Sequence, residues 1–397
     1  MTDPAALAKA KTLLPRATPD EQLLVRWMTA IQDHNLLPAI ASMNDLLKRF
    51  PRDKHVLYVT GEWLFLQQDN DRARTLLETA LQVDPNFPAA LNRLGYLYLD
   101  SSNPDPAKAA DSLKRYAEVE PTSPNPQDSL GEVLRQAGED QASLEHYHAA
   151  LKLDPAYVSS QYGMGNTLTL MGDFVKARQE YDRALPMAGN PMDRLYVKYL
   201  KTFVYFWEGK LEEGRAAFAA LAKEAAEEKE PNSQFQIGLA QAMLATDSQS
   251  ELEQLKSLFT FLANPLAGMN ESDRGINRAS VLRERTRVVA LQGKSEDAKQ
   301  ILSELESLAT ASRDQLIGSY FESARGYVLA AKGDFKGAAD GLSADEHSPL
   351  VLQQLAAVQE KLGNAAAAEA ARTCLKYHRS SEAEWFLATH STAASAN

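Results

Sequence analysis

Across 397 residues the chain carries 42 basic and 53 acidic side chains, which gives it a formal net charge of −11. This excess of negative charge argues against nucleic-acid binding and against docking on an anionic membrane surface, because both ligands attract cationic proteins. No apolar run is long enough to span a bilayer, and a single cysteine excludes an internal disulfide and a zinc-finger type of metal site. With Met1 as the native start, the absence of a secretory leader pattern predicts a cytoplasmic protein; a leader removed ahead of Met1 would instead indicate the periplasm.

Residues 1–52 are predicted to form an N-terminal capping helix followed by a degenerate helix pair. Pro4 to Leu14 has the composition of a short helix, and apolar residues at helical spacing begin near Asp20. The bulky Trp27 stands where the following units have a glycine. Such an irregular unit is typical of the end of a repeat array.

Residues 53–190 contain an internal repeat with a clear step of 34 residues. In each unit small residues let two helices pack closely, a glycine ends the first helix and a proline stops the second. The clearest matches at this step are Gly131 with Gly165, Gly138 with Gly172, Tyr147 with Tyr181 and Leu151 with Leu185. The pattern resembles the tetratricopeptide repeat (TPR), a helix-turn-helix unit that stacks into a solenoid. A plain helical bundle with accidental periodicity is the alternative.

A stretch from Lys114 to Leu134 resembles, more narrowly, a group of bacterial TPR proteins. The residues that carry this resemblance are Tyr116, Glu118, Pro121, Pro124, Asn125, Pro126, Asp128, Ser129 and Gly131. That group has no single agreed activity, so the resemblance implies a scaffold and nothing catalytic.

Beyond residue 190 the repeat pattern weakens. Residues 191–266 are predicted to form degenerate TPR-like units with an unusually aromatic helix, and 267–278 a hinge loop. Residues 279–379 are predicted to form C-terminal TPR-like units, and 380–397 a disordered tail. The sequence therefore predicts an all-α fold, a right-handed α-solenoid of about ten helix-turn-helix units.

Motifs for catalysis, metals and cofactors find little support in the sequence. It contains no GxxxxGK[ST] phosphate loop, no GxSxG nucleophile elbow and no HExxH zinc motif. The two closest histidines, His146 and His148, lie two residues apart on a predicted helix and so face different directions. We expect a non-enzymatic protein without a cofactor.

The TPR resemblance implies a binding surface on the concave face of the solenoid, which the first helices of the units line. Mapping the inward-facing positions of the family onto this sequence gives the candidate partner-binding residues Tyr58, Tyr96, Tyr162, Asn166, Tyr199, Phe203, Arg283, Arg287 and Tyr327. Tyrosine and arginine suit such a surface because they combine large contact area with polar groups. The alternative for the aromatic residues is packing between units.

Arg283 and Arg287 lie four residues apart, on one face of a predicted helix. Like charges at this spacing repel, so we expect an acidic neighbour or a bound anion beside them. The alternative is a solvated face that Glu284 neutralises.

Two functions are compatible with these features. The first is a protein–protein interaction scaffold that binds a peptide segment of a partner protein in the concave groove. The second is a ligand-responsive sensor or regulatory subunit whose solenoid closes on a small molecule or peptide about the hinge loop. The sequence does not identify the partner, and self-association through the end units stays open.

Overall fold

The computed structural model describes residues 4–32 and 35–390 of the chain. These residues form α-helices and two short 3-10 turns, and no β-strand occurs among them. None of the described helices combines the length and the apolar character that crossing a membrane requires. The predicted all-α solenoid is therefore confirmed.

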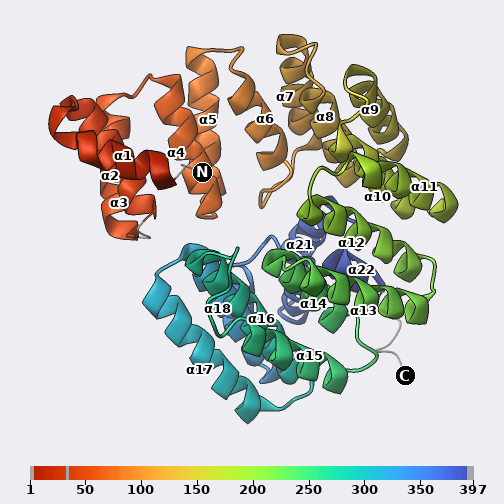
Figure 1. Cartoon of the computed structure of the whole chain (residues 1–397). Coiled ribbons are helices and arrows are strands. Elements are labelled where there is room, and N and C mark those ends of the chain that lie inside the picture. Colours follow the sequence, from red (N-terminus) through yellow and green to blue (C-terminus); the bar gives the residue numbers. More distant parts are fainter. Residues whose placement is uncertain (1–3, 33–34, 391–397) are drawn as a thin grey trace.

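The N-terminal half is an arc of helix pairs in which consecutive helices pack on each other (Figure 1). The helix bounds in this half are α1 Pro4–Leu13, α2 Pro19–Gln32, α3 Leu36–Arg49, α4 Lys54–Leu66, α5 Asn70–Val83, α6 Pro88–Leu97, α7 Pro106–Val119, α8 Asn125–Ala137, α9 Asp140–Leu153, α10 Val158–Leu170 and α11 Phe174–Ala184. Each even-numbered helix from α4 to α10 is the first helix of a unit.

The C-terminal half continues the same alternation, with helices that range from 8 to 21 residues. Its bounds are α12 Pro191–Trp207, α13 Leu211–Glu227, α14 Pro231–Met243, α15 Ser248–Phe261, α16 Glu271–Leu291, α17 Ser295–Ser312, α18 Gln315–Ala331, α19 Phe335–Leu342, α20 Pro349–Lys361, α21 Ala365–Tyr377 and α22 Ala383–His390. Again the even-numbered helices from α12 to α20 come first in their units, while α22 has no following partner helix in the described chain.

Glycine and aspartate define the turns inside the units. Gly138 and Gly172 follow α8 and α10 with φ angles of 83° and 82°, a left-handed conformation that glycine adopts without a steric penalty. Asp173 then accepts a hydrogen bond from the backbone N–H of Lys176 and caps α11. The turn glycine and the cap thus separate the two helices of a unit at a fixed residue.

Close packing within a unit depends on a second class of glycine. An added Cβ at Gly165 would lie 2.7 Å from the ring of Tyr181, and one at Gly131 would lie 2.7 Å from the ring of Tyr147. Both tyrosine side chains are buried. The glycine therefore makes room for the aromatic ring that fills the space between the helices.

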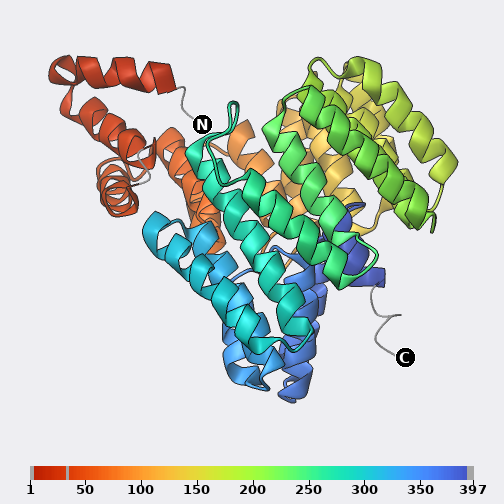
Figure 2. The same cartoon turned by 60° about the horizontal axis from the view of Figure 1, so that its bottom comes forward.

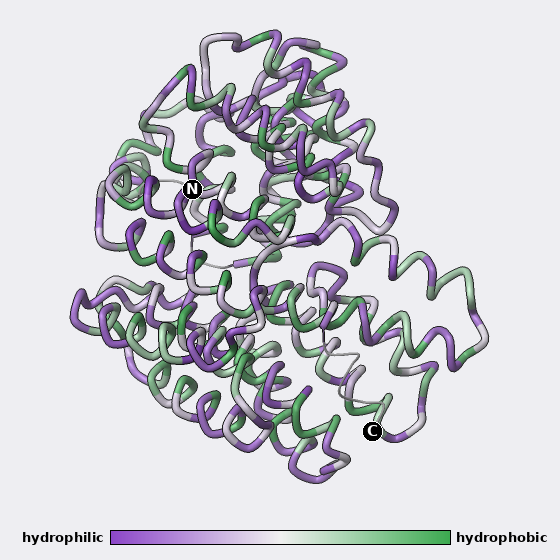
Figure 3. Tube along the Cα trace, turned by 90° about the vertical axis from the view of Figure 1, so that its right-hand side faces the viewer, coloured by the Kyte–Doolittle hydropathy of each residue, from purple (hydrophilic) through white to green (hydrophobic). Residues whose placement is uncertain are grey.

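Every helix buries one face, and Figure 3 shows hydrophobic and hydrophilic residues alternating along the tube. The buried apolar residues form several clusters along the array instead of one central core, as expected for a repeat protein. One cluster breaks this local pattern, because it joins residues of α10 to α14 to Leu350 and Phe386 near the end of the chain.

That cluster marks the closure of the solenoid on itself. Figures 1 and 2 show the C-terminal helices passing beside the middle of the N-terminal arc, and α21 contacts α8. His347 and Asp100 form a 2.6 Å contact between their side chains, and Cys374 donates a hydrogen bond to the backbone carbonyl of Ser102. From α6 onward the array therefore closes into a ring of units, and the concave face of this part is enclosed.

Two of the predicted segments differ in the structure. Residues 271–278 of the predicted hinge belong to α16, because the Asn270 side chain accepts a hydrogen bond from the N–H of Asp273 and caps that helix. The loop between α15 and α16 instead covers residues 262–270. In the predicted tail, residues 383–390 form α22 because Phe386 finds a buried aromatic site, whereas residues 391–397 lie outside the described part.

We expect Gly165→Ala to lower the free energy of unfolding by about 1–3 kcal/mol, because the added methyl group must displace the buried Tyr181 ring. Chemical denaturation followed by circular dichroism measures this change. Gly189→Ala is the matched control, since its Cβ would meet no atom within 4 Å. Equal effects of the two substitutions would show that close packing at Gly165 does not matter.

Candidate functional site

The concave face of the ring holds a segment of the chain itself. Residues 379–390, called here the C-terminal segment, lie against α8, α10 and α12 on one side and against α16 and α20 on the other. The segment consists of an irregular stretch, 379–382, and the helix α22. It occupies the position in which TPR resemblance implies a bound partner peptide.

Arg379 anchors the start of this segment to the N-terminal half. Its guanidinium forms an ion pair with both carboxylate oxygens of Asp140, and its Nη1 also donates to the carbonyl of Arg135 at 2.9 Å. In return, Nη1 of Arg135 donates to the carbonyl of Arg379 at 2.6 Å. The side chain of each arginine thus donates a hydrogen bond to the backbone carbonyl of the other, although 244 residues of sequence separate them.

Aromatic stacking holds the other end of the segment. The rings of Trp207 and Trp385 stack with centroids 5.6 Å apart, and Phe386 and His390 also pack on Trp207. The indole N–H of Trp207 donates to the carbonyl of Ser381 at 2.7 Å. Trp207 therefore binds the segment through both its ring and its one hydrogen-bond donor.

Two of the candidate residues contact the C-terminal segment directly. The hydroxyl of Tyr199 donates to Oε2 of Glu382 at 3.1 Å. Oδ1 of Asn166 accepts from the hydroxyl of Ser381 at 3.2 Å and from that of Tyr181 at 2.7 Å. A third candidate, Tyr162, packs edge-on against Tyr196 in the same groove.

Other candidates do not offer a free binding surface. Phe203 is fully buried between Tyr199 and Phe218, and Tyr327 is buried in the core of the C-terminal half. Arg283 is buried as well, and the Arg287 side chain is 13% exposed. The prediction of an exposed partner site at these four positions is wrong. Phe203 packs on Phe218 of the next helix, Tyr327 packs in the core of the C-terminal half, and both arginines pair with carboxylates of their surroundings.

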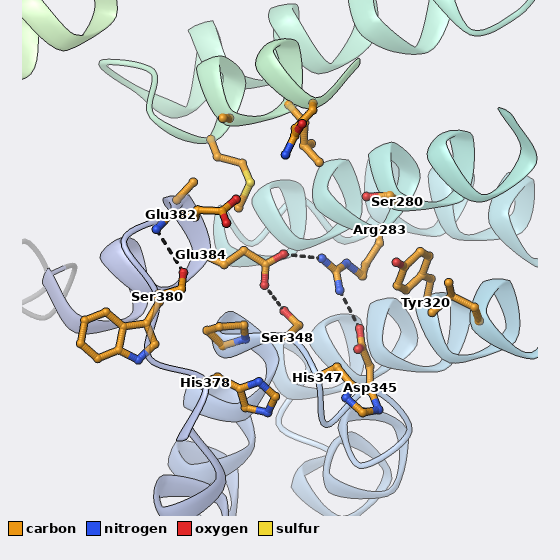
Figure 4. Close-up of a pocket in the computed structure, with 18 of the residues that line it drawn as sticks. Ser280, Arg283, Tyr320, Asp345, His347, Ser348, His378, Ser380, Glu382 and Glu384 are labelled. Atoms are coloured by element: carbon orange, nitrogen blue, oxygen red, sulfur yellow. Dashed lines mark hydrogen bonds and ion pairs between the residues drawn. The ribbon is translucent and has the colours of Figure 1, made fainter. Parts of the chain in front are cut away.

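Arg283 lies at the centre of an ion-pair cluster, of which Figure 4 draws the pairs with Asp345 and Glu384. Its guanidinium contacts the carboxylates of Asp345 at 2.6 Å, Glu384 at 2.8 Å and Glu284 at 3.1 Å, and lies over the ring of Tyr320. Burial raises the pKa of Glu384 above its ordinary value, and Arg283 opposes this shift. Arg283 thereby joins the C-terminal segment to the loop before α20.

Arg287 has acidic neighbours of its own. It pairs with Glu284 at 2.7 Å and with Glu251 at 2.8 Å, and burial raises the pKa of Glu251 to about 7 although Arg287 opposes that shift. The expected acidic neighbours of both arginines are therefore present. The alternative of a solvated face is wrong.

The remaining candidates lie toward the N-terminal end of the groove. The hydroxyl of Tyr96 contacts Ser129 at 3.0 Å and Glu132 at 3.2 Å, which links α6 to α8. Tyr58 packs edge-on against Phe87 and lines an open pocket of about 430 Å³ together with Arg93. The C-terminal segment does not reach this part of the concave face.

A larger cavity of about 730 Å³ lies beside the C-terminal segment, and part of its lining appears in Figure 4. Its walls come from α8, α12, α14, α16 and α18, from the loop before α20 and from residues 378–385. Polar and charged side chains dominate the part formed by the C-terminal segment, whereas α14 contributes apolar ones.

Sequence reasoning missed the partners that lie in the predicted tail. Trp385 and Phe386 are two adjacent aromatic residues in a stretch that otherwise resembles a solvated terminus. Their presence was the available signal, because aromatic side chains are depleted in disordered segments. The pairing of Arg379 with Asp140 had no signal in the sequence, since 239 residues separate them.

Two family models match the N-terminal half, one described as "Tetratricopeptide repeat" over residues 64–128 and one described as "TPR repeat" over residues 131–172. Tetratricopeptide repeat protein 7B of Homo sapiens is 27% identical over 160 residues, which are 38% of this chain and only 19% of that relative. A solved tetratricopeptide repeat protein of Parabacteroides merdae is similar with a TM-score of 0.47 and 15% identity, covering 66% of this chain and 98% of its own. A thermophilic TPR protein of Thermus thermophilus has a TM-score of 0.38 and 21% identity, covering 47% and 97%.

Replacing Arg283 tests the ion-pair cluster. We expect Arg283→Ala to lower the free energy of unfolding by about 3–5 kcal/mol, because it leaves buried carboxylates without their cation. Thermal and chemical unfolding measure the loss. Arg325→Ala removes a half-exposed pair with Glu322 and should cost at most about 0.5 kcal/mol. A loss at Arg283 no larger than this control would contradict the structural role of the cluster.

Asp128 of α8 makes stability depend on pH. Burial raises its pKa to about 6, although the Ser160 hydroxyl donates to it at 2.7 Å. The stability that the protonated form contributes is fully present below about pH 4 and is lost as pH rises through about 6. We expect Asp128→Asn to be more stable than the parent by about 1–3 kcal/mol at pH 7.5 and equal to it near pH 4. An unfolding series over pH 4–8 measures this difference, and exposed Asp111→Asn should show none.

Proposed function

We propose that this tetratricopeptide repeat protein binds a peptide segment of a partner protein in the concave groove formed by α8, α10 and α12, because such repeats are those of a protein-interaction scaffold. The observation that supports this proposal is the C-terminal segment in that groove. Trp207, Tyr199, Asn166 and Arg135 together hold a peptide that is partly irregular and partly helical. A groove that fits one such segment has the chemistry to fit another.

The contacts define what a partner segment must supply. Trp207 needs a backbone carbonyl for its N–H and an aromatic ring on which to stack. Asp140 needs a cation, which Arg379 provides in the free protein, and Tyr199 needs a carboxylate or another acceptor. We therefore propose a partner segment with a basic residue followed, within a few residues, by an acidic residue and an aromatic pair.

The C-terminal segment competes with any such partner. Because the segment is covalently attached, its effective concentration is on the order of millimolar, and a partner must overcome this local competitor. The apparent association constant for a partner equals the intrinsic constant multiplied by the fraction of molecules whose groove is open. The free protein would accordingly be a latent form of the scaffold.

The uncovered N-terminal end of the concave face extends the proposed site. Tyr58, Phe87 and Arg93 line a pocket there that the C-terminal segment leaves open. A partner segment longer than the C-terminal segment could begin in this pocket without first displacing anything. In this proposal Tyr58 makes first contact and Trp207 provides the anchor after displacement.

We expect weakening of the C-terminal segment to increase peptide binding. In the chain that carries Trp385→Ala and Phe386→Ala, the segment loses two of its three ring contacts with Trp207 and keeps that of His390. A fluorescently labelled peptide with the sequence of residues 379–390 should then bind at least about tenfold more tightly than to the parent protein. Fluorescence anisotropy measures both affinities.

The matched control adds Trp207→Ala to the same double variant, which leaves the groove empty but removes its anchor. Peptide binding should fall again by at least about tenfold. If the peptide binds neither the parent nor the opened variant, the groove is not a peptide site. Equal binding with and without Trp207 would place the peptide elsewhere on the molecule.

A further inference from the structure

The cavity beside the C-terminal segment has the size of a small-molecule site. Its volume of about 730 Å³ falls within the range of roughly 300–1,000 Å³ that is typical of ligand pockets. It lies where the two halves of the ring meet, and interfaces of this kind are common places for ligand sites. The chemistry of the wall then decides which class of ligand it fits.

The cations around the cavity already have partners. Arg283 contacts Asp345, Glu384 and Glu284, and Glu384 also accepts a hydrogen bond from Ser348 at 2.6 Å. Arg379 pairs with Asp140 outside the cavity wall. Arg135, on the same wall, donates to the carbonyl of Arg379 and lies 3.8 Å from Glu132. The charges of these arginines are therefore offset by neighbouring carboxylates, although the buried Nε atoms of Arg283 and Arg135 make no hydrogen bond.

Two carboxylates on the same wall, those of Glu382 and Glu132, have no ion pair as short as those that Arg283 forms. Glu382 receives the hydroxyl of Tyr199, but no Lys, Arg or His nitrogen lies within 4.0 Å of it in the described ranges. Glu132 receives the hydroxyl of Tyr96 and has Arg135 only at 3.8 Å. Figure 4 shows Glu382 apart from Arg283, whereas Glu384 is bonded to it. Acceptor capacity and negative charge are thus left over at these two positions.

The electrostatic environment of Glu382 also favours the binding of a cation beside it. Burial raises the pKa of Glu382 above its ordinary value, Arg135 opposes that shift, and Glu384 and Glu132 add to it. A buried carboxylate without a close counterion is costly, and a cation brought beside it would remove most of that cost.

The part of the wall that α14 contributes is apolar and makes an organic cation a better fit than a metal ion. Phe235, Leu239 and Met243 follow one another at intervals of four residues on one face of α14, and Ile276 and Leu316 continue this surface. Within the described ranges, no group of three or more His, Cys, Asp or Glu side chains is placed to hold a metal.

We propose that this cavity binds a small primary amine with an apolar body, its ammonium group between Glu382 and Glu132 and its apolar part against α14. Amine binding requires no partner peptide, so it can succeed or fail independently of the scaffold function. Because Glu382 belongs to the C-terminal segment, a bound amine would also hold that segment in place.

The test compares matched probes on the full-length protein by isothermal titration calorimetry. Phenethylamine and hexylamine are the cations, 2-phenylethanol and hexanol their neutral counterparts, and 3-phenylpropanoate and hexanoate their anionic ones. We expect at least one amine to bind at least about tenfold more tightly than its alcohol and its acid. The proposal is overturned if neither amine binds at about 10 mM, or if an alcohol or acid binds as well as its amine.

Substitutions then place the ammonium group. Glu382→Gln keeps the shape and the hydrogen bond to Tyr199 but removes the charge, and should weaken amine binding at least about tenfold. Glu132→Gln removes the second charge and tests the site if the first variant does not fold. Glu369→Gln, at an exposed position, is the control and should leave amine binding unchanged. Amine affinity that persists in both folded cavity variants would refute the assignment.

Discussion

One buried guanidinium, that of Arg283, connects parts of the chain that repeat stacking alone would not bring together. Three carboxylates surround it, and they come from its own helix, from the loop before α20 and from α22. A charge at this depth is tolerated only with such partners, so the position of α22 and the burial of the Arg283 guanidinium depend on each other. The enclosed groove and the cavity beside it both follow from this arrangement.

The local architecture could be predicted from the sequence because each unit is specified by nearby residues. The pairs Gly131 with Tyr147 and Gly165 with Tyr181 lie within one helix hairpin, and small and large side chains at fixed spacing encode their contact. The turn glycines after α8 and α10 have the same local origin. Asn166 and Tyr199, which the family mapping assigns to inward-facing positions of their units, both contact the C-terminal segment.

The closure of the ring could not be predicted in this way. It results from small rotations between successive units, summed over the array, and from contacts such as Arg135 with Arg379 that no periodicity encodes. For this reason Arg283, which occupies a position that faces a partner in an open solenoid, is buried here, whereas Phe203 is buried by Phe218 of the next helix. The same cause made residues 383–390 resemble a free tail.

The order of the helices in the chain determines which parts of the ring are synthesised, and can fold, first. The C-terminal segment follows every helix that it contacts, so those helices leave the ribosome before the residues that fill their groove. Repeat units fold from near-neighbour contacts and can form while translation continues. During that interval Trp207 and Tyr199 face solvent, and a nascent chain would present an open groove that the completed protein no longer shows. A partner present at the ribosome would meet this groove before its competitor exists.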